Sequence, residues 1–189
     1  MEAFLTSTLL VALAEVGDKT QLLSFVLAAR LRKPRAIILG IFVATLLNHA
    51  LAGSVGVWLA SLIAPHALPW ATGLLFVGFG LWTLHPDSLD EDPGLYRAGA
   101  FVTTTIAFFV AEMGDKTQLA TVALGARFDM LTSVVIGTTL GMLIANIPAV
   151  LVGEALAQKL PVQTIRYVAA GVFIVTGLVT MFGIPGTAQ

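Results

Sequence analysis

Long apolar runs separated by short polar breaks restrict this chain more than any other feature. A helix needs about 20 apolar residues to cross about 30 Å of hydrocarbon. Six segments approach or meet this length, the third being the shortest. They run from Ala3 to Ala29, Arg35 to Ala64, Leu68 to Leu84, Gly99 to Ala126, Met130 to Leu156 and Val162 to Phe182. Because backbone polar groups inside a bilayer must bond within the chain, each segment is expected to be an α-helix.

The composition agrees with a membrane protein and excludes several classes of function. Of the 189 residues, 57% are hydrophobic and 11% are charged, and the mean hydropathy is +0.92. The few Lys and Arg residues lie mostly in short loops, so the basic face that a nucleic-acid-binding protein needs is missing. The chain contains no cysteine, which excludes disulfides, thiolate metal ligands and a cysteine nucleophile. A bound metal would therefore need oxygen or histidine ligands.

An internal duplication relates the two halves at an offset of 97 positions. Glu15–Gln21 reads EVGDKTQ and Glu112–Gln118 reads EMGDKTQ. Asn48 and Asn146 correspond if one residue is inserted. The further matches pair Leu27 with Leu124, Arg30 with Arg127, Gly40 with Gly137, and Gly80 with Gly177. We therefore expect a first three-helix repeat at 1–84, an acidic linker at 85–98 and a second repeat at 99–189, within one integrated transmembrane domain.

Three spans per repeat is an odd number, so the second repeat would enter the membrane from the opposite side. The predicted fold class is an all-α membrane protein with six transmembrane helices in two inverted three-helix repeats. Cytoplasmic loops carry an excess of Lys and Arg. With the amino terminus outside, the outer loops hold only Arg127, whereas the inner loops hold Arg30, Arg32, Lys33, Arg35, Arg97, Lys159 and Arg166. We therefore expect a multi-pass protein of the cell (inner) membrane with both termini outside.

Both acidic motifs are expected near the bilayer midplane. Glu15 and Glu112 each follow a phenylalanine at the start of their span by 11 residues, which is about 16 Å of helix. A carboxylate at that depth costs at least about 2.5 to 3.5 kcal/mol. In a regular helix the Glu, Asp and Lys of one motif would share a face. Together the two motifs carry a formal charge of −2, which one divalent cation would neutralise.

The candidate metal ligands all supply hard oxygen donors, which suit Mn²⁺, Ca²⁺ or Mg²⁺. The carboxylate candidates are Glu15, Asp18, Glu112 and Asp115, and the neutral candidates are Thr20, Gln21, Asn48, Thr117, Gln118 and Asn146. Lys19 and Lys116 are expected to balance charge as internal counter-ions to the neighbouring carboxylates. The expected partners are therefore membrane lipid, a divalent cation and protons, with no prosthetic group. Association into a homo-oligomer stays open.

Several of these features also have a plainer structural explanation. Asp18 or Asp115 would cap a helix that restarts after the motif glycine, with the Gln reaching back as in a capping box. That explanation leaves both motif glutamates unexplained. His49 is expected to be a packed histidine. Close helix packing is the simplest role for Gly40, Gly53, Gly56, Gly137 and Gly141. The linker acids Asp87, Asp90, Glu91 and Asp92 are expected to be solvated, with a cation sensor as the alternative.

Two other functions are alternatives to a cation carrier. An intramembrane aspartyl protease would use Asp18 and Asp115 as a dyad that shares a proton. The Lys that follows each Asp would instead hold it ionised, and we do not expect an enzyme. A proton-coupled exporter of small solutes or amino acids is the second alternative, because the same carboxylates would also carry protons.

The duplicated motif resembles that of the Gdt-type cation antiporters, also known as uncharacterised protein family 0016. The resemblance covers all six apolar segments, and Glu15–Gln21 and Glu112–Gln118 show no departure from the family pattern. It implies transport of Mn²⁺ or Ca²⁺ in exchange for protons, and short bacterial members of this kind act as manganese exporters. By the same resemblance, the Glu and Asp of each motif would be the cation ligands.

Overall fold

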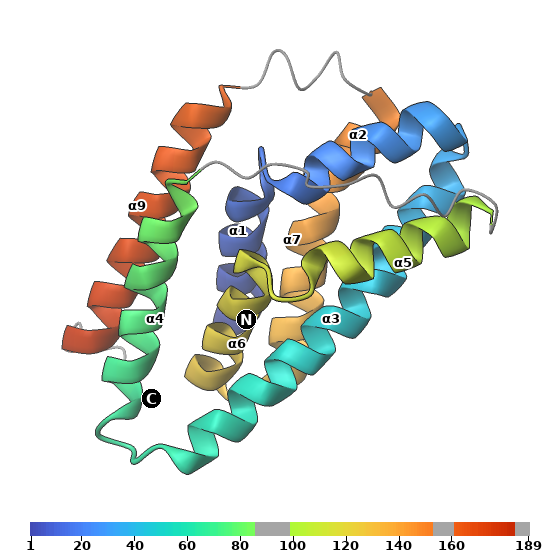
Figure 1. The fold of residues 1–189 in the computed structure, drawn as a ribbon. Coiled ribbons are helices and arrows are strands. Elements are labelled where there is room, and N and C mark those ends of the chain that lie inside the picture. Colours follow the sequence, from blue (N-terminus) through green and yellow to red (C-terminus); the bar gives the residue numbers. More distant parts are fainter. Residues whose placement is uncertain (86–98, 153–160, 184–189) are drawn as a thin grey trace.

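The structure is a computed structural model that describes residues 1–85, 99–152 and 161–183. Within these ranges every regular element is an α-helix (Figure 1). The helices are α1 (Glu2–Glu15), α2 (Lys19–Leu31), α3 (Pro34–Leu62), α4 (Leu68–Thr83), α5 (Ala100–Glu112), α6 (Lys116–Phe128), α7 (Leu131–Val152) and α9 (Val162–Phe182). The expectations for the linker acids Asp87, Asp90, Glu91 and Asp92 fall outside the described residues.

Three of the helices, α3, α7 and α9, are long and apolar enough to cross a membrane, and α4 and α5 are shorter apolar helices. The predicted boundaries of the second, third and sixth segments agree with α3, α4 and α9 to within two residues. The expected all-α fold is therefore confirmed for the described residues, three of whose helices could cross a membrane.

The first and fourth predicted segments are each interrupted at their acidic motif. α1 ends at Glu15 and α2 begins at Lys19, while α5 ends at Glu112 and α6 begins at Lys116. In each break a glycine adopts a positive φ, +81° at Gly17 and +77° in the second motif, a region that glycine enters at little steric cost. The picture of a regular helix with Glu, Asp and Lys on one face is therefore wrong. The backbone turns between the glutamate and the aspartate.

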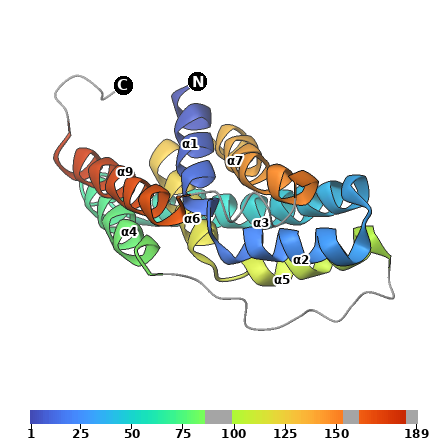
Figure 2. The ribbon, with the colours of Figure 1, turned by 90° about the horizontal axis from the view of Figure 1, so that it is seen from above.

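Helices from the two halves of the sequence pack against each other. α1 lies along α7, α5 lies along α3, and α4 pairs with α9 (Figures 1 and 2). Small residues allow this close approach, as predicted. A Cβ on Gly137 would lie 2.6 Å from the Phe4 carbonyl oxygen, and one on Gly56 would lie 2.1 Å from that of Val122. A Cβ on Gly40 or Gly141 would also approach a carbonyl oxygen, and one on Gly53 would lie 2.9 Å from Leu131 Cδ1. The packing role expected for these five glycines is therefore confirmed.

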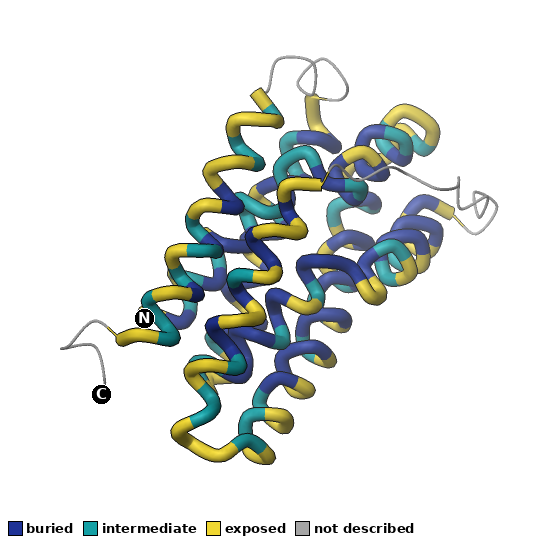
Figure 3. Tube along the Cα trace, turned by 60° about the vertical axis from the view of Figure 1, so that its left-hand side comes forward, coloured by how far each residue is buried: buried dark blue, intermediate teal, exposed yellow. Residues whose placement is uncertain are grey.

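The interior contains an apolar core together with many buried polar side chains, and large apolar side chains are exposed on the outer faces. Figure 3 shows how buried and exposed residues alternate along the helices. The motif glutamates, Asn48, Asn146 and several threonines are buried between the helices. Large apolar side chains are exposed on α1, α3, α4, α7 and α9, among them Leu5, Leu9, Leu51, Leu74, Leu81, Ile144 and Val175. A water-soluble protein rarely presents so many exposed apolar side chains together, whereas a membrane protein does so toward lipid. The chain is therefore a membrane protein.

Candidate functional site

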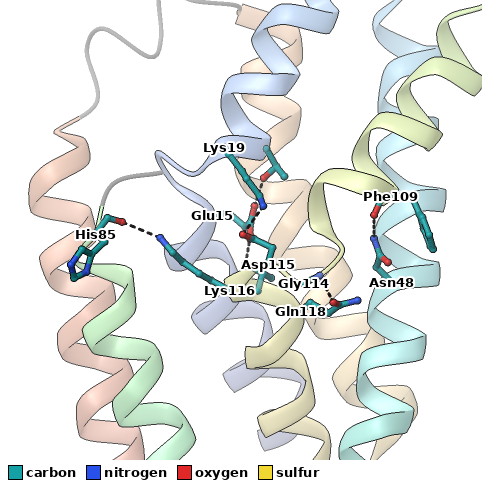
Figure 4. Close-up of polar contacts among 11 residues, drawn as sticks. Glu15, Lys19, Asn48, His85, Phe109, Gly114, Asp115, Lys116 and Gln118 are labelled. Atoms are coloured by element: carbon teal, nitrogen blue, oxygen red, sulfur yellow. Dashed lines mark hydrogen bonds and ion pairs between the residues drawn. The ribbon is translucent and has the colours of Figure 1, made fainter. Parts of the chain in front are cut away.

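The two motif breaks lie against each other, and their glutamates and aspartates are buried. Lys19, the first residue of α2, forms an ion pair with Asp115, which stands immediately before α6, with 2.9 Å between Nζ and Oδ1 (Figure 4). Thr117 in the first turn of α6 donates a hydrogen bond to Glu15 at the end of α1. Residues about 100 positions apart in the sequence therefore form one polar centre.

The carboxylate of Glu15 is held by hydroxyl groups from both motifs. Its side chain is fully buried. Thr20 Oγ1 donates to Oε2 over 2.7 Å, and Thr117 Oγ1 donates to Oε1. Each carboxylate oxygen thus accepts a hydrogen bond from a different half of the chain. Both threonines were among the predicted site residues, but the structure shows them as donors to Glu15.

Glu112 differs sharply from its counterpart in the first motif. It is also fully buried, yet neither of its carboxylate oxygens has a hydrogen-bond partner among the described residues. It interacts electrostatically with Glu15, Asp115 and Lys19. Leaving a buried polar group without a partner costs about 1–3 kcal/mol, and more for a charged group. Such a carboxyl group is suited to take up a proton or a cation, either of which would remove this cost.

Asp18 and Asp115 occupy the N-cap positions of α2 and α6, but neither carboxylate bonds to the free backbone N–H groups of its helix. The glutamines stabilise the breaks instead. Gln21 Oε1 accepts a hydrogen bond from the Gly17 N–H over 2.9 Å, and the second motif repeats this contact from Gly114 to Gln118 over 2.6 Å. The capping-box interpretation is therefore correct for the position of the aspartate. It is wrong for the carboxylate, which does not cap the helix, and for the target of the glutamine, which is the N–H of the preceding glycine instead of that of the aspartate.

The buried amides of the site mainly join helices together. Gln21 Nε2 donates to the Ala145 carbonyl of α7 over 3.0 Å. Asn146 Oδ1 accepts from Ser24 Oγ of α2 over 2.7 Å, a partner that sequence reasoning missed because Ser24 lies outside the motif. Asn48 Nδ2 donates to the Phe109 carbonyl of α5 over 3.1 Å. Its Oδ1 has no hydrogen-bond partner in the described part of the chain, so this oxygen remains available as a ligand.

The two motif lysines, which are equivalent in the sequence, have different surroundings. Lys19 pairs with the aspartate of the other motif instead of that of its own motif. Lys116 donates to the His85 carbonyl oxygen over 3.0 Å (Figure 4), and its Nζ lies 6.0 Å from the ring centroid of Trp82. Lys19 and Lys116 thus make different contacts, although they occupy equivalent positions in the two motifs.

A small pocket reaches the break between α1 and α2. We call it the motif pocket, and it is lined by Ala14, Val16, Gly17, Asp18, Thr83, Lys116 and Arg166. Across residues 1–85, 99–152 and 161–183, no three carboxylate or histidine side chains converge closely enough to hold a metal ion. The motif carboxylates are neighbours in this conformation, but they do not form a closed coordination shell.

His49 lies in α3 beside Asn48 and is fully buried. Neither of its ring nitrogens has a hydrogen-bond partner among the described residues. A packed histidine agrees with the expectation. The protease interpretation does not fit the geometry, because the ion pair between Lys19 and Asp115 favours an ionised aspartate over one that shares a proton.

Comparison with known proteins supports the resemblance seen in the motifs. The sequence model of the family described as "Divalent cation/proton antiporter GDT1" matches residues 3–91 and again residues 100–186. A Vibrio cholerae protein named "Putative manganese exporter" is 51% identical over 183 residues, which cover 96% of this chain and 92% of that protein. "GDT1-like protein 5" of Arabidopsis thaliana is 27% identical over 94% of both chains. No solved structure matches the chain.

The expected family is thereby confirmed, and it is a family of transporters, not of enzymes. The match spans both acidic motifs and all of the described helices. This chain belongs to the GDT1 family of divalent cation/proton antiporters.

Proposed function

We propose that this protein exports Mn²⁺ from the cell in exchange for protons, and that the two acidic motifs form its cation site. The observation that carries this proposal is the buried, unpartnered carboxyl group of Glu112 next to the hydroxyl-bound carboxylate of Glu15. The name of the Vibrio cholerae relative supports Mn²⁺ as the cargo. The oxygen-only donor set supports a hard divalent cation.

Competition for the same oxygens links the metal to protons. A carboxyl group in a dry interior is far more stable when it binds a proton or a cation than when it is an isolated charge. Glu112 and Glu15 would bind Mn²⁺ together with Asp18 and Asp115, and protons would take its place when the metal leaves. Since carboxylate ligands bind metal only when deprotonated, one site occupied in turn by metal and by protons produces exchange.

Lys19 has a defined part in this proposal. Its ammonium group supplies a positive charge to Asp115 in the structure. Mn²⁺ at the site would displace Lys19 from Asp115, which would limit the change in net charge as the cargo enters and leaves. The neutral candidates then divide in two groups. Asn48 Oδ1, Thr20 and Thr117 would contribute oxygens beside the exchanged ions. Gln21 and Gln118 instead hold the glycine backbone of the breaks, and Asn146 holds Ser24 of α2.

An inverted repeat of two three-helix units is the architecture that we propose for exchange. Contacts related by the offset of 97 support it. Gly40 packs on the Phe101 carbonyl and Thr104, and Gly137 packs on the carbonyl of Phe4 and on Ser7. Each residue of the first set corresponds to one of the second at that offset. Phe76 and Phe173 correspond to each other and stack with 6.4 Å between ring centroids, as expected for residues beside a pseudo-twofold axis.

The proposed setting is the inner membrane, with six spans formed by α1–α2, α3, α4, α5–α6, α7 and α9. Lipid would contact their exposed apolar faces. Both termini would lie outside, because the basic loops then face the cytoplasm.

Flux through proteoliposomes under an imposed pH gradient tests the proposal, with Mn²⁺, Ca²⁺ and Mg²⁺ compared. Mn²⁺ should move against the proton flow, and Glu112→Gln and Glu15→Gln should each abolish the movement. Asp129→Asn is a matched control, because it removes an exposed carboxylate after α6 and should leave flux intact. The proposal fails if the wild-type protein moves none of these ions, or if the motif variants move them as well as the wild type does.

A further inference from the structure

The helix pair α4–α9 is a tightly packed unit. A Cβ on Gly73 would lie 2.7 Å from the Gly177 carbonyl oxygen, and one on Gly80 would lie 2.8 Å from that of Ala170. Trp70 of α4 and Phe182 of α9 meet edge to face, with 5.4 Å between ring centroids. With backbones in contact at two levels and aromatic rings between them, the two helices are expected to move together.

This pair contacts one side of the two motif breaks more than the other. α4 packs against α6, and α9 packs against α1. These are the segments that the breaks separate from α2 and α5, which lie side by side farther from the pair (Figures 1 and 2). The α4–α9 pair thus packs against α1 and α6 more than against α2 and α5.

One polar contact joins α6 to the α4–α9 pair. Arg127, in the last turn of α6, donates from Nη1 to Thr180 Oγ1 in the last turns of α9. Its guanidinium is half-buried and is attracted by the carboxylate of Glu2 at the start of α1. Arg127 therefore links α6 to the α4–α9 pair by a hydrogen bond and to α1 by electrostatic attraction.

At the other end of α4–α9 the corresponding residues are arranged differently. The offset of 97 that relates the motifs also relates Arg127 to Arg30 and Thr180 to Thr83. Arg30 stands in the last turn of α2 and is exposed. Thr83 lines the motif pocket together with Arg166 at the start of α9. Its hydroxyl donates to the Phe79 carbonyl over 2.9 Å, as that of Thr180 does to the Thr176 carbonyl over 2.7 Å, so the two ends differ in the arginine and not in this bond. The end of the protein that holds Thr83 is therefore the end with a pocket leading to the motif.

We infer that Arg127–Thr180 and Arg30–Thr83 are two alternative gate contacts, and that the α4–α9 pair moves between them during transport. In the conformation described, the first gate is closed and the motif pocket lies at the second. When α4–α9 moves toward α2 and α5, Arg30 bonds to Thr83, the motif pocket closes, and the contact between Arg127 and Thr180 opens. This inference rests on the proposed transport function.

Cysteine crosslinking tests the inference directly, because the natural chain has no cysteine. The variant Arg127→Cys with Thr180→Cys should crosslink readily in membranes without Mn²⁺. Its oxidised form should lose Mn²⁺ flux, and reduction should restore the flux. The variant Arg30→Cys with Thr83→Cys should crosslink mainly during turnover, when Mn²⁺ and a pH gradient are both present. The matched control joins Trp70→Cys to Phe182→Cys within the α4–α9 pair, and its crosslinked form should keep its flux.

Two results would contradict the inference of two alternative gate contacts. One is full flux through the oxidised Arg127→Cys, Thr180→Cys protein. The other is crosslinking of the two pairs that does not shift in opposite directions when Mn²⁺ and the pH gradient are added, a readout that does not require the variants to transport. Absence of flux through the wild-type protein would instead reject the proposed function, so the two failures are distinguishable.

Discussion

At the scale of single residues, the two motif glutamates should differ in stability although both are needed for transport. Glu15→Gln puts an amide nitrogen where one carboxylate oxygen accepts a hydroxyl hydrogen bond. Losing a hydrogen bond to a charged group costs about 1.5–3 kcal/mol. Glu112 has no such bond to lose among the described residues. Glu112→Gln should therefore lower the free energy of unfolding less than Glu15→Gln, as measured by thermal unfolding in detergent with metal chelated.

Two threonines of α6 test whether the hydrogen bond to Glu15 matters for transport. Thr117→Val removes a donor to Glu15, whereas Thr121→Val, one turn farther along, removes only a bond to the backbone carbonyl of its own helix. Thr117→Val should impair Mn²⁺ flux, and Thr121→Val should preserve it. For the glutamates, an equal loss of stability in Glu15→Gln and Glu112→Gln would contradict the difference in hydrogen bonding between these two residues.

At the scale of elements, the glycine in each helix break should resist substitution, and to different degrees. Gly17 and Gly114 both have positive φ, where an L-residue costs roughly 1–2 kcal/mol. A Cβ on Gly17 would also lie 2.1 Å from Val162 Cγ1, whereas one on Gly114 meets no described atom within 4 Å. Gly17→Ala should therefore lower the melting temperature more than Gly114→Ala.

Gly78→Ala and Gly171→Ala are the matched controls. Both glycines lie inside helices with negative φ and with open space around the added Cβ in the described structure. Alanine there should stabilise the helix by up to about 1 kcal/mol. If Gly17→Ala is as mild as these controls, the break between α1 and α2 does not have the described backbone.

The helices were predictable from the sequence to a greater extent than the contacts between the motifs. Apolar runs and prolines located α4 and α9 because hydropathy and helix-breaking residues act locally. The duplication predicted that the two motifs would lie at the same depth in the membrane. The pairing of Lys19 with Asp115 and the two hydroxyl bonds on Glu15 were not predictable, because they depend on how the breaks turn and how two helices face each other. The difference in hydrogen bonding between Glu15 and Glu112 was not predictable for the same reason, since the two motifs differ only at Val16 and Met113.

At the scale of the whole molecule, the distribution of basic residues predicts the orientation in the membrane. Single cysteines at Glu2 and at Lys33 can be placed in the cysteine-free chain. A membrane-impermeant maleimide added to intact cells should label the cysteine at Glu2 and should reach the one at Lys33 only after the membrane is opened. The reverse pattern would place both termini in the cytoplasm and contradict the predicted orientation.

The central claim is that one buried carboxylate site binds Mn²⁺ and protons in turn, and the most direct test is simultaneous measurement of both ions. Proteoliposomes with equal pH on both sides would receive a Mn²⁺ gradient, with one dye reporting Mn²⁺ and another reporting internal pH. The account predicts that Mn²⁺ entry drives protons out of the vesicles, and that Glu112→Gln abolishes both movements together. Mn²⁺ entry without proton movement, or with protons moving in the same direction, would contradict it.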